Sequence, residues 1–195
     1  MGGMRRALVL LVPAMLLAAC TPSPASDMPE DIAARLAQVD QAVADWADAA
    51  TPAEAHAAAE AARNLVLGPD APFYGDADGD GETLGAVAVG LLPGRDGQPG
   101  LVRDPAVNAC VERDVLGGSW ERPSERWDQA VAAIEEWRAD LNTFPGLSSH
   151  PQRLIGWATL ALESSDLDTI HEFASHARLH LEVARAAYDD CTTGI

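Results

Sequence analysis

The chain has 195 residues, 48% of them hydrophobic, and carries 30 acidic residues against 13 arginines and no lysine, a formal net charge of −17 at pH 7. This charge excludes nucleic-acid backbones and anionic membrane surfaces as primary partners, because their phosphate groups would be repelled. The hydrophobic fraction excludes a mostly disordered chain, and the length fits one folded domain with its own core.

The first 19 residues have the pattern of an export signal, in which two arginines precede a thirteen-residue apolar stretch, Ala7 to Ala19. That stretch is shorter than the ~20 residues that a membrane-spanning helix needs. Its end, LAAC at residues 17–20, resembles the lipobox of bacterial lipoproteins. The resemblance implies that residues 1–19 are removed and that Cys20 becomes a lipidated N-terminus. The alternatives are an ordinary secretory signal and a short membrane anchor.

Residues 20–29 are rich in Pro and Ser, which is typical of an extended tether. We therefore expect a single helical domain over residues 30–195, anchored through Cys20 to the extracytoplasmic face of a membrane in the bacterial cell envelope. Without the two arginines of the signal, eleven remain against 30 acidic residues, a formal charge of −19. The sequence leaves open which envelope membrane carries the anchor.

Apolar residues recur at steps of three and four from Ile32 to Trp46, which predicts a helix. Arg35 lies among the polar residues on the opposite, solvent-facing side of this helix. The sequence Thr51-Pro52-Ala53-Glu54 is a helix start, with an N-cap, a proline at the first helical position and an acid two residues later. This second helix runs to Leu67, where Gly68-Pro69 ends it.

Residues 68–105 are crowded with Gly, Pro and Asp, and only residues 84–92 suggest a short helix or strand. A loop of this length inside a compact domain is usually functional or held by an ion. Helical patterns return after it, and they begin at Pro105, Ser124, His150 and Asp166. We expect the first to end at Gly117-Gly118, the second to extend past Leu141, and Asp166 to cap the last.

The sum of these patterns predicts an all-α domain, an irregular bundle of four to five principal helices with a long Gly/Pro/Asp-rich loop insertion. The chain also carries five tryptophans, at positions 46, 120, 127, 137 and 157. Most of them fall on or near apolar helix faces, so we expect them in the core rather than in a ligand platform.

Beyond Cys20, two cysteines remain, Cys110 and Cys191. Disulfides persist in exported proteins, and two thiols allow a single pairing. We expect a Cys110–Cys191 disulfide that clamps the last helix near its end; two unrelated buried thiols are the alternative.

The stretch from Asp76 to Glu82 resembles the first half of the EF-hand calcium loop, D-x-D-x-D-G. The resemblance implies that Asp76, Asp78 and Asp80 contribute carboxylates and that Glu82 contributes its backbone carbonyl to calcium. The bidentate Glu of the family is missing, because Val87 stands in its place. Missing ligands would come from water or from residues such as Asp70, Asp96 or Asp104. We expect a structural calcium site, and the alternative is a solvated acidic turn, since Asp-Gly pairs favour turns.

The last predicted helix carries Glu172, His176 and His180 at steps of four, on one stripe beside its core face. Such a stripe is a candidate transition-metal site, although its spacing matches no zinc-protease or di-iron motif, and an ordinary polar stripe is the alternative. His56 and Glu60 form another four-spaced pair, which we place in solvent. His150 is expected to begin a helix.

No nucleophile elbow, phosphate-binding loop or dinucleotide fingerprint occurs in the chain. The leading expectation is a lipid-anchored extracytoplasmic binding protein with a calcium-stabilised loop, which engages a metal, a small solute or an envelope protein. The alternative is a metal-dependent enzyme that uses the Glu172/His176/His180 stripe. A second alternative is a purely structural envelope lipoprotein.

Overall fold

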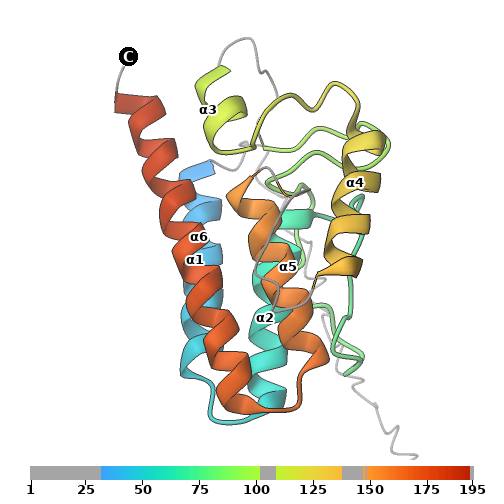
Figure 1. Ribbon diagram of the computed structural model, residues 1–195, viewed down its shortest axis with the longest axis vertical. Helices are drawn as coiled ribbons and strands as arrows, with labels where there is room; N and C mark the ends of the chain where they lie inside the picture. The colour runs from blue at the N-terminus through green and yellow to red at the C-terminus, as the bar shows by residue number, and fades with distance from the viewer. Residues whose placement is uncertain (1–31, 102–108, 138–146, 148, 194–195) are drawn as a thin grey trace, which may run out of the picture.

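The computed structural model describes residues 32–101, 109–137, 147 and 149–193, and these contain six helices and no strand (Figure 1). The all-α prediction is therefore confirmed. The lipobox, Cys20 and the tether lie outside the described residues. The helices are α1 (Ile32–Asp48), α2 (Pro52–Leu67), α3 (Ala109–Asp114), α4 (Pro123–Glu136), α5 (His150–Glu163) and α6 (Leu167–Thr193).

Four long helices form an antiparallel bundle in which α1 packs against α2 and α6, and α5 packs against α6 and α2. Figure 1 shows the α1–α2 and α5–α6 turns at the same end of this bundle. The connection from α2 to α5 leaves from the opposite end and contains the long loop, α3 and α4. The bundle is thus a scaffold with one large insertion, residues 68–149.

The helix starts follow from local side-chain chemistry. The Thr51 hydroxyl accepts a hydrogen bond from the backbone N–H of Glu54 at 3.2 Å, and the Asp166 carboxylate accepts one from Thr169 N–H at 2.9 Å. Both caps were predicted, and each satisfies an N–H that the helix leaves without an internal partner. Ser149 caps α5 in a reciprocal capping box with Gln152.

The tryptophans lie in the core, as predicted. The side chains of Trp46, Trp127 and Trp157 are at most 2% exposed. Trp46 donates its indole N–H to the Ile170 carbonyl at 3.1 Å, and Trp127 donates to the Pro93 carbonyl at 2.9 Å. Trp46 and Trp127 therefore satisfy their indole N–H groups while burying large apolar surfaces.

Arg35 was expected in solvent, and this prediction is wrong because the side chain is fully buried. Its Nη1 donates to the Leu65 carbonyl at 2.7 Å and to the Val89 carbonyl at 2.8 Å. The last carbonyls of a helix have no internal partners, and a guanidinium supplies several donors to such groups. Arg35 thus ties α1 to the end of α2 and to the insertion.

Residues 84–92 form neither a helix nor a strand, but they contribute to the core through Leu91 and Leu92, each 1% exposed. The chain comes back to the end of α2, where Leu92 N–H donates to the Val66 carbonyl at 3.1 Å. Gly68 has φ +70°, and a Cβ there would lie 2.3 Å from the backbone nitrogen of Gly90. Glycine is required at this crossing because two backbones touch.

The Cys110–Cys191 disulfide is present, with Cα atoms 5.5 Å apart, and it joins α3 to the end of α6. The helix that contains Cys110 is described from Ala109 to Asp114, so it ends two residues before Leu116, the last residue before the predicted stop at Gly117-Gly118. Its predicted start at Pro105 lies outside the described part of the chain. Helix α4 ends at Glu136, and Trp137 has an extended backbone with φ −69° and ψ 137°, so the prediction of one continuous helix past Leu141 is wrong. Residues 138–146 lie outside the described part. Within the described residues, no helix combines the length and the apolar character needed to cross a membrane.

Candidate functional site

The acidic loop is closed by its own carboxylates. Asp76 accepts hydrogen bonds from the N–H groups of Gly79 at 2.8 Å and of Gly81 at 2.9 Å. Asp78 accepts from Asp80 N–H at 3.1 Å, and Asp80 accepts from Glu82 N–H at 2.8 Å. Short polar side chains that bond to nearby backbone groups stabilise such turns, so each of the three carboxylates helps to hold the loop closed.

Glu60 of α2 lies beneath this loop and is 1% exposed, so the prediction that it faces solvent is wrong. Its carboxylate accepts hydrogen bonds from the N–H groups of Leu84 at 2.8 Å, of Asp78 at 3.2 Å and of Ala77. One turn further along α2, Asn64 bonds to the N–H and the carbonyl of Gly75 and to the Leu84 carbonyl. The loop is therefore anchored on α2 at both of its ends.

Carboxylate oxygens of Glu60, Asp76 and Asp78 lie within 4.8 Å of one another. Asp80 and Glu82 are not members of this group, and neither are Asp70 and Asp96, while Asp104 lies outside the described residues. Glu60 therefore adds a third carboxylate to two from the EF-hand-like spacing. Three carboxylates that approach one another suit a hard divalent cation, and calcium accepts such oxygens in irregular geometry.

The histidine stripe of α6 is divided between two surroundings. His176 stacks on Trp157 with ring centroids 4.3 Å apart, and its Nε2 lies 4.0 Å from a Glu172 carboxylate oxygen. His180 turns toward α5, where its Nδ1 lies 3.0 Å from Nδ1 of His150, the first residue of that helix as predicted. His56, which we expected in solvent, is half-buried against the Ser164 carbonyl.

Among the described residues, the groups of three or more possible ligand atoms close enough to share an ion contain no histidine. Besides the acidic loop there is one such group, Cys110, Asp114 and Cys191, whose two sulfurs are already joined. Burial, followed by the positive charges of His150, Arg153 and His176, lowers the pKa of His180 to about 4. The positive charge of Arg153 disfavours a metal cation beside His180. The geometry therefore favours a hydrogen-bonded pair of the His150 and His180 imidazoles. The transition-metal site stays a prediction.

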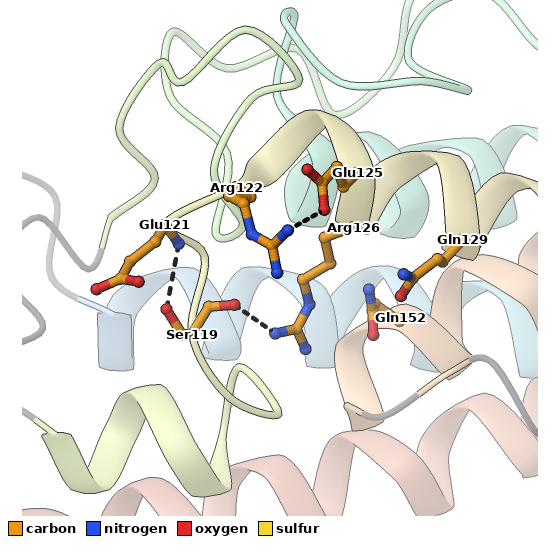
Figure 2. Close-up of a pocket in the computed structure, with 7 residues that line it drawn as sticks. All are labelled: Ser119, Glu121, Arg122, Glu125, Arg126, Gln129 and Gln152. Carbon is orange, nitrogen blue, oxygen red and sulfur yellow. Dashed lines mark hydrogen bonds and ion pairs between the residues drawn. The ribbon is translucent and has the colours of Figure 1, made fainter.

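A polar pocket of about 280 Å³ opens between α4 and the start of α5 (Figure 2). Figure 2 shows Arg122, Arg126 and Gln129 reaching from α4 toward the space that Gln152 of α5 also faces. The remaining lining residues are Ser119, Glu121 and Glu125. Burial lowers the pKa of Arg126, although the Glu112 carboxylate opposes this effect.

Arg126 is positioned by the chain segment that precedes α4. Its two terminal nitrogens donate to the carbonyls of Ser119 at 2.8 Å, Leu116 at 3.0 Å and Gly117 at 2.8 Å. Its guanidinium lies 4.5 Å above the Trp120 ring, in a cation–π contact. Arg126 therefore has a fixed position and keeps its positive charge beside the pocket.

Comparison with known protein families, with curated proteins and with solved structures finds no match to this chain.

Helix periodicity alone does not indicate the role of Glu60 or of the pocket residues. A signal for the pocket was present, because Arg122, Arg126 and Gln129 are spaced by four and three residues on one face. A signal for Glu60 was also present, since it begins a polar group with Arg63 and Asn64 in an otherwise Ala-rich helix. The role of Glu60 depends on the insertion folding back over α2, and no local sequence pattern encodes that contact.

Proposed function

We propose that the protein is a lipid-anchored binding protein of the bacterial cell envelope, whose extracytoplasmic domain carries a calcium-stabilised loop. The lipobox-like LAAC sequence at residues 17–20 supports the anchor, through Cys20. The convergence of Glu60, Asp76 and Asp78 carboxylates supports the cation site. This convergence carries the proposal, because α2 brings the buried Glu60 to a loop that already has the EF-hand-like spacing.

Calcium would have a structural role: it would order the insertion and would not act as a conformational switch. The loop has little core of its own, and it is joined to α2 through the hydrogen bonds of Glu60 and Asn64. A cation among the carboxylates offsets their mutual repulsion and fixes residues 75–84 on the scaffold. A fixed insertion then presents a constant surface to a small solute or to an envelope protein, the partners that this proposal requires.

Thermal unfolding of the domain from residue 21 onward, in calcium and in chelator, tests the calcium site. At a calcium concentration of about a hundred times Kd, binding adds about 2.7 kcal/mol. For a domain of this size we expect the Tm to rise by roughly 5–10 °C. The substitution Asp78→Asn removes one member of the carboxylate group and abolishes the rise.

Glu82→Gln is the matched control, because it also removes one loop carboxylate but leaves the converging group and its own backbone carbonyl in place. It keeps the calcium-dependent rise. A rise of equal size in Asp78→Asn, or no rise in the unsubstituted protein, would reduce the loop to an acidic turn.

A further inference from the structure

The polar pocket between α4 and α5 is separate from the calcium loop, since none of its lining residues belongs to residues 75–84. Arg122 precedes the first residue of α4, and together with Arg126 and Gln129 it forms a strip beside the face that buries Trp127 and Ile134. The strip borders the core and opens on a hollow instead of packing against α5. Polar groups that converge on a concave site fix the orientation of a bound ligand.

The pocket has a fixed floor. Gln152 is 1% exposed and belongs to the capping box of α5, in which its Oε1 accepts from Ser149 N–H at 3.3 Å. Arg126 is held by three backbone carbonyls and by the Trp120 ring. Groups that are already positioned lose little conformational entropy when a ligand binds, which favours affinity for a small molecule.

Two arginines and two glutamates line the pocket, so its preference for an anion depends on how these charges are placed. Two of the 13 arginines of this strongly acidic chain meet at one hollow. Arg122 is paired with Glu125 at 2.5 Å, but both side chains are largely exposed, and a pair of this kind contributes little. In Figure 2 the Glu121 side chain extends away from the two guanidinium groups. The field of the whole chain disfavours polyanions, so a single negative charge fits best.

From these observations we propose that this pocket binds a small organic monocarboxylate that also carries hydroxyl or amide groups. The planar guanidinium of Arg122 matches a carboxylate, which a fork of this kind binds in a bidentate manner. Arg126, whose terminal nitrogens donate to three backbone carbonyls, contributes its positive charge. Gln129 and Ser119 offer hydrogen bonds to the hydroxyl or amide groups of the ligand. A volume of about 280 Å³ suits a metabolite rather than a peptide or polymer. This inference rests on the proposed binding function and names the class of its solute.

Isothermal titration calorimetry on the domain from residue 21 onward tests the proposal with N-acetyl-L-alanine and quinate as probes. N-acetyl-L-alaninamide is the matched neutral compound, and inorganic phosphate is the competing anion. We expect at least one carboxylate to bind with a Kd of about 1 mM or tighter, and the neutral amide and phosphate to bind at least about tenfold more weakly. Equal binding of the amide or of phosphate, or no binding of either carboxylate, would overturn the proposal.

Arg122→Gln removes an exposed guanidinium that no fold contact requires, and it weakens binding by about tenfold, the effect of one lost charge-assisted hydrogen bond. Arg95→Gln is the matched control. Arg95 is also an exposed arginine, it is paired with Asp128 of α4, and it lies outside the pocket. It changes the net charge equally and leaves binding unchanged. Equal weakening by both substitutions would show a general charge effect and overturn the site.

The two proposals fail separately in this experiment. Each titration is run in calcium and in chelator, and the Tm is measured in parallel. A missing calcium shift with intact carboxylate binding rejects the calcium loop alone, whereas a normal calcium shift without carboxylate binding rejects the pocket alone.

Discussion

Two buried ionisable side chains join the insertion to the bundle: Arg35 as a hydrogen-bond donor and Glu60 as a hydrogen-bond acceptor. Arg35 donates to carbonyls of α2 and of residue 89, and Glu60 accepts from three N–H groups of the acidic loop. A buried ion is tolerated when hydrogen bonds replace its hydration, and its removal leaves several backbone groups unsatisfied. These two residues explain how a Gly-rich segment with few core side chains keeps one position.

Neither residue could be assigned from the sequence, although both lie in helices that were predicted with good boundaries. Periodicity places Arg35 and Glu60 opposite the apolar stripes of α1 and α2, and that geometry is correct for an isolated helix. The insertion covers those faces and converts them into buried surfaces. The turn formed by the loop carboxylates, by contrast, follows from a local spacing, because Asp and Gly at neighbouring positions favour a turn on their own.

The His150–His180 pair predicts a loss of stability in acid. An unfolded histidine takes up its proton near pH 6.5, whereas the pKa of folded His180 is about 4. The folded-state pKa is depressed, so the stabilisation is complete above pH 6.5, decreases as the pH falls toward 4, and is lost below that value. We expect this histidine to account for about 1–2 kcal/mol of the loss, because its ring still reaches solvent in part.

Urea unfolding of the unsubstituted protein and of His180→Gln, at about pH 7.5 and about pH 4.5, measures this effect. The glutamine keeps a polar group toward His150 but does not titrate, and the titration of the carboxylates cancels between the two proteins. The stability difference between them should shift by about 1–2 kcal/mol in favour of the variant at the lower pH. If the stability difference does not change with pH, the pKa of His180 in the folded protein is not lowered.

At the scale of elements, helix starts were the most predictable part of the fold because their chemistry is local. Thr51, Asp166 and the prolines near the starts of the helices are readable in sequence, and the structure confirms their use. Contacts between elements were not readable. Gly156 of α5 is an example, since it lies in a helix without any turn signal, and only its neighbour explains it.

A Cβ at Gly156 would lie 2.0 Å from Cζ3 of Trp137, whose side chain is 4% exposed. Gly156→Ala gains about 1 kcal/mol of helix propensity, but overpacking against a fixed indole costs more. Trp137 also packs edge-on against Trp157 with ring centroids 4.4 Å apart, so it has little room to move. We expect Gly156→Ala to lower the free energy of unfolding by about 1–2 kcal/mol.

A double-mutant cycle with Trp137→Leu checks this cause. If the clash is responsible, alanine at position 156 destabilises the Trp137→Leu protein less than it destabilises the original, with a coupling energy of about 1 kcal/mol or more. Additive effects would mean that the glycine serves another purpose, such as backbone flexibility.

At the scale of the whole molecule, scaffold and sites are separated. The bundle of α1, α2, α5 and α6 supplies most of the core, whereas residues 68–149 supply the acidic loop and most of the polar pocket. Loops on a rigid scaffold are common carriers of function. The Cys110–Cys191 disulfide is the covalent link between this insertion and the last helix, so it sets how firmly the two parts are joined.

The disulfide closes a loop with a sequence separation of 81 residues, and in the chain-entropy model this constraint stabilises the fold by about 4 kcal/mol. We expect the double variant Cys110→Ser/Cys191→Ser to lose up to that amount in urea unfolding without reductant. The unsubstituted protein in thiol reductant should behave like the variant, which separates the covalent link from the effect of the serine side chains. The loss should also be local: hydrogen exchange should accelerate in α3 and in the last turns of α6, while the α1–α2 pair stays protected. A loss below about 1 kcal/mol with unchanged exchange at both ends of the link would show that helix packing alone joins the insertion to the bundle.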